Sequence, residues 1–172
     1  LALDLKKGDE IITTPRTFIA TSSSAVLLGL KPVFVDVDIN SGVITSKNIE
    51  QAITKKTKAI VVVHLAGWPA EMIKICKLAR NYGLFIIEDC SQAHGAKIND
   101  KSVGTFGDIA TWSFCQDKII TTGGEGGMLS TNNFKFFNKV WSFRDHGKKH
   151  EKVDSKLNNY SFRWIHDNFG SN

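Results

Sequence analysis

Two short segments of the sequence contain side chains that could act together in catalysis. In the first, the apolar run 84–87 leads directly into two acids, Glu88 and Asp89, and a small polar turn follows. In the second, another apolar run ends at Ser113, Lys118 comes five residues later, and a glycine-rich turn lies just beyond it. Ligands of open α/β sheets bind at the carboxyl ends of strands. These residues are therefore candidates for a common site.

An acid, a hydroxyl, an amine and a tight turn are the parts that pyridoxal 5′-phosphate (PLP) requires. A carboxylate keeps the ring nitrogen protonated, hydrogen-bond donors hold the phosphate, and an amine forms a Schiff base. A carboxylate beside the ring nitrogen favours its charged form by about 1 to 3 pKa units, which makes the ring a better electron sink. Asp89, Ser113 and Lys118 could supply these three functions.

Simpler interpretations of the same residues stay open at this point. An acid at a strand end, such as Asp89, is more often a helix cap or one half of a loop salt bridge. Most lysines are solvated charges, and Lys118 alone carries no signal. The glycines of 123–127 match neither a phosphate-binding loop nor a dinucleotide-binding turn, because a further strand follows them. They are expected to be tight-turn residues.

The histidines do not predict a metal site. His146 and His150 are spaced as on one helix face, but the lysines between them would oppose a cation. His64 and His94 follow apolar runs near the candidate site, where we expect structural hydrogen bonding. We therefore predict no bound metal.

Short β-rich apolar runs alternate with segments of helical periodicity, which is typical of a mostly parallel sheet covered by helices. Helices are expected over Thr17–Leu28, over Ser46–Ile53, and from Pro69 to a stop at Gly83. The strand candidates are Glu10–Thr13, Val33–Val37, Ala59–His64, Leu84–Glu88, Ile109–Phe114 and Gly127–Ser130.

Bulk properties narrow the class of protein. A chain of 172 residues with 42% hydrophobic content can form one sizeable core. The formal net charge is +5, but the 22 lysines and arginines are scattered, so we expect no nucleic-acid partner. No apolar stretch is long enough for a membrane span, and three unpaired cysteines fit a cytoplasmic protein. Both chain ends look like cuts through a longer protein.

An ordered set of segments resembles the DegT/DnrJ/EryC1/StrS family of PLP-dependent sugar aminotransferases. The resemblance implies a fold-type I scaffold like that of aspartate aminotransferase: a three-layer α-β-α domain with a mostly parallel sheet and one antiparallel strand. It also implies transfer of an amino group from glutamate to a keto group on a nucleotide-linked sugar. The segments that carry the resemblance are Gly8–Ile12, Pro15–Thr21, Lys31–Asp38, Glu88–Gly95 and Ser113–Gly127.

The resemblance assigns roles residue by residue. Lys118 matches the lysine that forms the Schiff base with the cofactor and later shuttles protons. Asp89 matches the acid that pairs with the ring nitrogen, and Gln92 the side chain that faces the phenolic oxygen. Phe18 matches an aromatic residue that stacks on the ring, although a plain core aromatic is the alternative.

Two further residues match phosphate ligands, and one segment departs from the family. Ser113 matches a hydroxyl that binds the phosphate, and Asn172 an asparagine donated across a homodimer interface. Residues 115–117 replace the commoner aromatic-Pro-small sequence before Lys118. That change leaves substrate choice open.

The resemblance also implies what the chain lacks and what else it could be. An N-terminal Gly-Thr phosphate-binding turn and a C-terminal small domain of the family have no counterpart in residues 1–172, so we expect most of a large cofactor-binding domain. The implied setting is the synthesis of surface glycans such as lipopolysaccharide. Two alternatives are PLP-dependent sugar dehydration, in which relatives replace the lysine by histidine, and a non-catalytic relative.

Overall fold

The protein divides into two compact units, Leu5–Thr131 and a smaller one made of Leu1–Asp4 with Asn132–Asn172. The structure is a computed structural model that describes residues 1–150 and 166–171. The elements in chain order are β1 (Glu10–Thr13), α1 (Ala20–Leu27), β2 (Lys31–Phe34), α2 (Ser46–Ala52), β3 (Thr57–Val63), the 3-10 turn η1 (Leu65–Gly67), α3 (Met72–Tyr82), β4 (Phe85–Asp89), β5 (Lys97–Ile98), β6 (Lys101–Ser102), β7 (Ile109–Ser113), β8 (Gly127–Ser130) and α4 (Phe134–Arg144).

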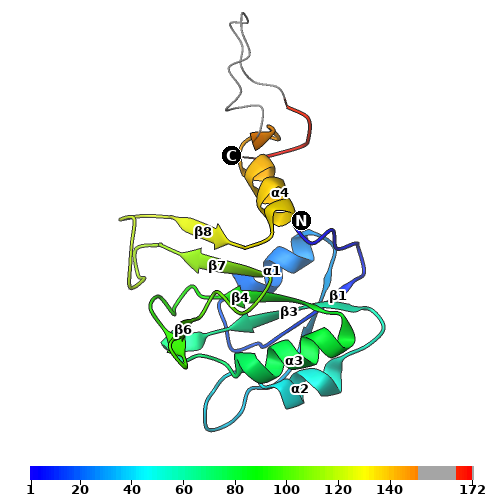
Figure 1. The fold of residues 1–172 in the computed structure, drawn as a ribbon, viewed down its shortest axis with the longest axis vertical. Coiled ribbons are helices and arrows are strands. Elements are labelled where there is room, and N and C mark those ends of the chain that lie inside the picture. The colour runs from blue at the N-terminus through cyan, green and yellow to red at the C-terminus, as the bar shows by residue number, and fades with distance from the viewer. Residues whose placement is uncertain (151–165, 172) are drawn as a thin grey trace, which may run out of the picture. The chain divides into compact units, whose positions relative to one another are not determined.

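A six-stranded sheet organises the larger unit, in the order β2-β1-β3-β4-β7-β8 (Figure 1). Every pairing in it is parallel except that of β7 with β8, which confirms the expected single antiparallel strand. β3 is buried along nearly its whole length, because it lies between β1 and β4 and is covered on both faces. Its β-branched run Ile60–Val63 suits that position.

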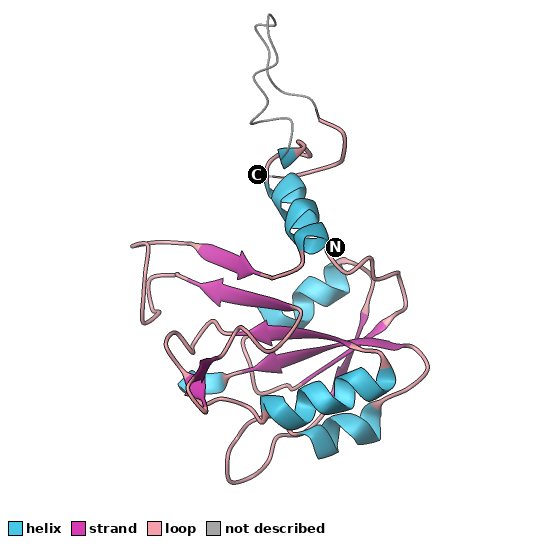
Figure 2. Cartoon of the chain, in the orientation of Figure 1, coloured by secondary structure: helices cyan, strands magenta, loops and turns pink. Residues whose placement is uncertain are grey.

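Helices cover both faces of this sheet, which gives the three expected layers (Figure 2). α2 and α3 lie together on one face, and α1 lies on the other. α3 buries Met72, Ile75, Cys76 and Ala79, the stripe that its periodicity predicts. The helix stops at Gly83, whose φ of 63° is left-handed and is a common helix C-terminus.

The carboxyl ends of three parallel strands meet at one edge of the sheet. Asp89, the last residue of β4, pairs with Val63 of β3 and with Thr111 of β7. Ser113 ends β7 two residues further on. The antiparallel strand β8 then returns beside β7, so the connection between them begins and ends at this same edge. Lys118 lies on that connection.

Several element boundaries differ from the sequence predictions. β2 covers Lys31–Phe34 rather than Val33–Val37, because it pairs residue for residue with the four-residue strand β1. α3 begins at Met72, since Glu71 before it has non-helical backbone angles, so Pro69 is not the first helical residue. α1 begins at Ala20, because Thr17 takes part in a turn in which its amide donates to Pro15.

The smaller unit contains a helix that the sequence analysis did not predict. α4 begins at Phe134, after the capping residue Asn133, whose side chain accepts hydrogen bonds from the backbone amides of Lys135 and Phe136. The helix buries only Phe136 and Ser142 among its described residues, so it lacks the regular apolar stripe that would reveal it. Across residues 1–150 and 166–171, every helix is too short or too polar to cross a bilayer.

Candidate active site

Asp89 presents its carboxylate at the carboxyl end of β4 with two contacts from neighbouring elements. Its Oδ1 accepts a hydrogen bond from the backbone amide of Ser91 at 3.1 Å, and its Oδ2 accepts one from the hydroxyl of Thr21 at 2.9 Å. The residue is half-buried and has no cationic partner among the described residues. Each carboxylate oxygen can accept more than one hydrogen bond. Asp89 is therefore neither a helix cap nor part of a salt bridge, and it keeps acceptor capacity.

Two threonines at the start of α1 orient this carboxylate. The hydroxyls of Thr17 and Thr21 lie 2.9 Å apart. Thr21 has one hydroxyl proton, which it donates to Asp89, so Thr17 must be the donor in the Thr17–Thr21 contact. The sequence analysis assigned no role to either hydroxyl. Their spacing of four residues on a helical segment was the signal that they would meet.

Lys118 lies on the loop between β7 and β8, and backbone hydrogen bonds close that loop at its base. The amide of Phe114 donates to the carbonyl of Gly126 at 2.8 Å, and the amide of Thr122 donates to the carbonyl of Phe114 at 2.9 Å. The side chain of Lys118 is 18% exposed, and its Nζ lies 3.0 Å from Oδ1 of Asp117. The hydrogen bond that Lys118 donates to Asp117 is the main reason why the pKa of Lys118 is raised; the charge of Asp89 adds to it.

Ser113 and Gln92 each retain hydrogen-bond donors. Oγ of Ser113 accepts a long bond of 3.4 Å from the amide of Cys115, which leaves its hydroxyl proton available to donate. The side-chain oxygen of Gln92 accepts from the amide of Ala66 at 2.8 Å. Because that contact uses the side-chain oxygen, the NH₂ group of Gln92 remains as a hydrogen-bond donor.

Phe18 and Asn172 are the two other predicted cofactor ligands, and the structure describes the first but not the second. Phe18 is 73% exposed, so it is not the plain core aromatic that was the alternative. Its carbonyl accepts from the amide of Thr21, which places Phe18 one turn before the residue that contacts Asp89. An exposed aromatic ring there is available to stack on a flat ligand. Asn172 lies outside the described residues.

The donor set at this edge fits PLP. Asp89 is an anionic acceptor suited to a protonated ring nitrogen, and Lys118 carries the amine. Ser113 and Gln92 hold unused donors for anionic oxygens, and Phe18 offers an apolar face. Each function that the cofactor requires has one matching side chain.

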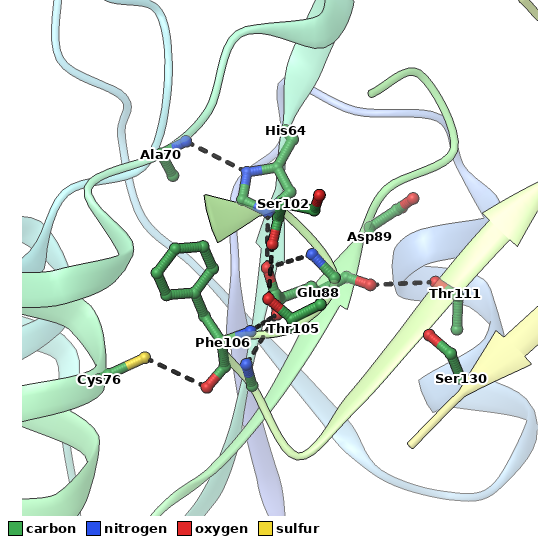
Figure 3. Close-up of polar contacts among 12 residues, drawn as sticks. His64, Ala70, Cys76, Glu88, Asp89, Ser102, Thr105, Phe106, Thr111 and Ser130 are labelled. Carbon is green, nitrogen blue, oxygen red and sulfur yellow. Dashed lines mark hydrogen bonds and ion pairs between the residues drawn. The ribbon is translucent and has the colours of Figure 1, made fainter. Parts of the chain in front are cut away.

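Glu88, the neighbour of Asp89 on β4, belongs to a separate buried network (Figure 3). Its side chain is fully buried. Oε1 accepts from the amides of Phe106 at 2.8 Å and Gly107 at 2.7 Å, whereas Oε2 accepts from the amide of Gly104 at 2.8 Å and lies 3.1 Å from Nε2 of His64. Burial raises the pKa of Glu88, but the hydrogen bonds from His64 and the three amides outweigh it, so the pKa is lowered.

The residue types of this network could bind a metal, but hydrogen bonds and burial already occupy or neutralise their ligand atoms. Ligand atoms of His64, Glu88 and Cys90 lie within 4.8 Å of one another. Nδ1 of His64 accepts from the amide of Ala70 at 3.1 Å, so Nε2 carries the proton and donates to Glu88. Burial raises the pKa of the Cys90 thiol, which disfavours the thiolate that a metal needs. The cluster is a structural hydrogen-bond network, as expected for His64.

Two further histidines, His94 and His150, pack against aromatic rings. The expectation of hydrogen bonding is wrong for His94, whose buried ring nitrogens have no partner in the described part of the chain. Its ring lies 5.4 Å from that of Trp112 and 5.5 Å from that of Phe114. In the smaller unit, the ring of His150 packs edge-on against Trp141 with centroids 4.9 Å apart. His150 thus has a packing contact that accounts for it without a metal.

The chain is similar to known proteins. GDP-perosamine synthase from Escherichia coli O157:H7 is 46% identical over 86% of this chain and 40% of its own length. The crystal structure of an aminotransferase from Psychrobacter cryohalolentis is 53% identical, with a TM-score of 0.96 over 99% of this chain and 43% of that one. An Escherichia coli GDP-4-keto-6-deoxy-D-mannose-3-dehydratase with bound hydrated PLP is 35% identical, with a TM-score of 0.79 over 84% of this chain and 37% of that one.

The chain spans 38–40% of the length of the first curated relatives that it matches. Over its whole length, residues 1–172, it matches the profile of one family. That family and the PLP-bound structural relative identify PLP as the cofactor, in agreement with the donor set at Asp89 and Lys118. The chain belongs to the DegT/DnrJ/EryC1/StrS aminotransferase family.

Proposed function

We propose that this chain is the cofactor-binding part of an enzyme that transfers an amino group from glutamate to a keto group on a nucleotide-linked sugar. The observation that carries the proposal is that Asp89 ends β4, while Lys118 lies on the loop that follows the neighbouring parallel strand β7. Similarity to GDP-perosamine synthase supports a nucleotide-linked sugar as the substrate. Surface glycan synthesis as the setting rests on the family resemblance alone.

Each side chain has a defined task in this proposal. Bound PLP supplies an electron sink for the carbon that carries the reacting nitrogen. Asp89 accepts a hydrogen bond from the ring nitrogen and keeps it protonated, while Thr21 holds the carboxylate in place. The amine of Lys118 holds the cofactor and, once released, moves a proton to and from the reacting carbon. Ser113 binds the phosphate.

The proposal extends to the parts that the chain does not contain. The relatives are longer, which supports a large domain that is completed by further segments in the whole protein. A homodimer would let Asn172 of one subunit reach the phosphate of the other. We place this reaction in the cytoplasm, where nucleotide-linked sugars are handled.

The direct test is an assay of the full-length protein with PLP and glutamate against a panel of nucleotide-linked 3-keto and 4-keto sugars. We expect one keto sugar to be converted to an amino sugar with equal formation of 2-oxoglutarate. Lys118→Ala is the matched inactive control. A folded, PLP-loaded protein that converts no member of the panel with glutamate would contradict the proposal.

Sugar dehydration is the second candidate, because the structure also resembles a sugar 3-dehydratase. Lys118 argues against it, since the resemblance implies histidine at this position in such enzymes. Mass spectrometry of the product separates the two: a gain of nitrogen supports aminotransfer, and a loss of water supports dehydration. A non-catalytic relative would bind no PLP covalently and would show no visible absorbance band.

A further inference from the structure

The turn before Lys118 places two donors on one oxygen of Asp117. The amide of Lys118 donates to the carbonyl of Cys115 at 3.1 Å, which folds residues 115–118 into a tight turn. Nζ of Lys118 lies 3.0 Å from Oδ1 of Asp117, and Sγ of Cys115 lies 2.9 Å from the same atom. The carboxylate of Asp117 therefore receives the amine that the proposed reaction needs.

The charges around Lys118 agree with this geometry. Among the described residues, the charges that act on its amine include those of Asp117 and Cys115 of the same turn and of Asp89 of β4. The hydrogen bond that Lys118 donates to Asp117 is the largest influence and raises the pKa of Lys118. Reciprocally, hydrogen bonds from Cys115 and then from Lys118 lower the pKa of Asp117. The raised pKa favours the ammonium form of Lys118, and the lowered pKa favours the carboxylate form of Asp117.

The two partners differ in exposure. The Asp117 side chain is 68% exposed and that of Lys118 is 18% exposed. A carboxylate on the surface can be replaced without disturbing the core, and the side chain of the lysine that it binds is the less exposed of the two. A protonated amine cannot form a bond to an aldehyde carbon, so this contact opposes the covalent step until the proton leaves.

We propose that Asp117 is a positioning residue that binds the ammonium group of Lys118 whenever this amine is not bonded to the cofactor. The contact keeps the side chain ordered and directed to one place, and it reduces the fraction of amine that can react at neutral pH. Removing the charge of Asp117 should speed capture of PLP. The proposal rests on the proposed role of Lys118, but the pairing itself can be measured without PLP.

Competitive acetylation of the PLP-free full-length protein tests the pairing. Acetic anhydride labels unprotonated amines, and mass spectrometry of peptides gives the labelling rate of Lys118 relative to Lys77, an exposed lysine on α3. For Asp117→Asn we expect Lys118 to be labelled about two- to fivefold faster near pH 8, a change in keeping with a partly exposed ion pair. The rates should converge near pH 11, about where an ordinary lysine is unprotonated.

Matched variants decide the outcome. Glu125→Gln removes another exposed carboxylate of the same loop, one that does not act on Lys118. In this variant Lys118 should be labelled as fast as in the parent protein. Asp117→Glu should restore slow labelling. Equal labelling of Lys118 in the parent and Asp117→Asn proteins, or the same increase in Glu125→Gln, overturns the proposal. If borohydride instead maps PLP to another lysine, the role of Lys118 fails while the labelling result still decides the pairing.

Discussion

Two adjacent carboxylates on β4, Glu88 and Asp89, differ in what surrounds them. Glu88 is fully buried, and His64 and three backbone amides satisfy its oxygens. Asp89 is half-buried and, within the described part of the chain, accepts only from Thr21 and from the amide of Ser91. Successive side chains of a strand point to opposite faces of the sheet, which explains how neighbours reach such different surroundings.

This difference indicates that Glu88 stabilises the fold, whereas Asp89 is available for binding the cofactor. The hydrogen bonds of Glu88 fix the segment 104–107 and the residue after β3, so this carboxylate holds the strand ends together. The unused acceptor capacity of Asp89 has no structural purpose, and it is what a protonated ring nitrogen needs. We therefore expect substitutions at the two positions to affect different measurements.

The largest expected effect is on the activity of Asp89→Asn in the full-length enzyme. An amide cannot stabilise a protonated ring nitrogen, so kcat should fall by about 10- to 1,000-fold, which corresponds to about 1 to 3 pKa units at the ring. The free energy of unfolding should change by less than about 1 kcal/mol. Steady-state kinetics and urea unfolding measure both, and turnover within twofold of the parent would remove Asp89 from the site.

Glu88→Gln should show the opposite pattern. The amide keeps the shape of the side chain but turns a donor toward groups that already donate, so buried hydrogen bonds are lost at about 1 to 3 kcal/mol each. We expect the free energy of unfolding to fall by about 2 to 5 kcal/mol in urea titrations. A stability equal to that of Asp89→Asn would show that the distinction between the two acids is wrong.

The effect of Glu88 on stability should depend on pH. Its pKa is lowered from the usual 4.5, so its contribution is fully present above pH 4.5 and is lost as the pH falls through the lowered value. The gap in unfolding free energy between the parent protein and Glu88→Gln should therefore shrink in acid. Urea titrations at about pH 7 and pH 4 measure it. A gap that widens in acid would contradict the assigned ionised state.

The smallest expected effect concerns the threonine that orients Asp89. Thr21→Val removes the hydroxyl at 2.9 Å, and we expect kcat to fall by about two- to tenfold, the value of one hydrogen bond. Thr17→Val, which removes the donor to Thr21 only, should have a smaller effect and serves as its control. Equal losses in both variants would mean that the start of α1 acts through packing instead.

Sequence patterns were enough to predict the elements whose apolar residues are also the buried ones. β3 was predicted because it is a short, continuous run of β-branched apolar residues, and α3 because its apolar stripe has the helical period. α4 and the hairpin of β5 with β6 were missed. α4 buries few residues in a regular pattern, and each hairpin strand has only two residues, which is too short for alternation to register.

The same limits apply to the site. Asp89 and Lys118 were found because they follow apolar runs that had to be strands of one sheet. The contact of Thr21 with Asp89 joins residues 68 positions apart, and the Glu88 network joins residues 16–24 positions apart, so both are set by packing rather than by local pattern. The pairing of Asp117 with Lys118 is local, but adjacent residues carry no pattern that shows their side chains to meet.

The central claim is that Lys118 is the residue that holds PLP. Borohydride reduction of the PLP-loaded full-length protein fixes the cofactor on its lysine, and peptide mapping by mass spectrometry then locates it. We predict a single pyridoxyl group on the peptide that contains Lys118, and none in Lys118→Ala. A pyridoxyl group on Lys97, Lys101 or any other lysine, with Lys118 unmodified, would contradict the claim.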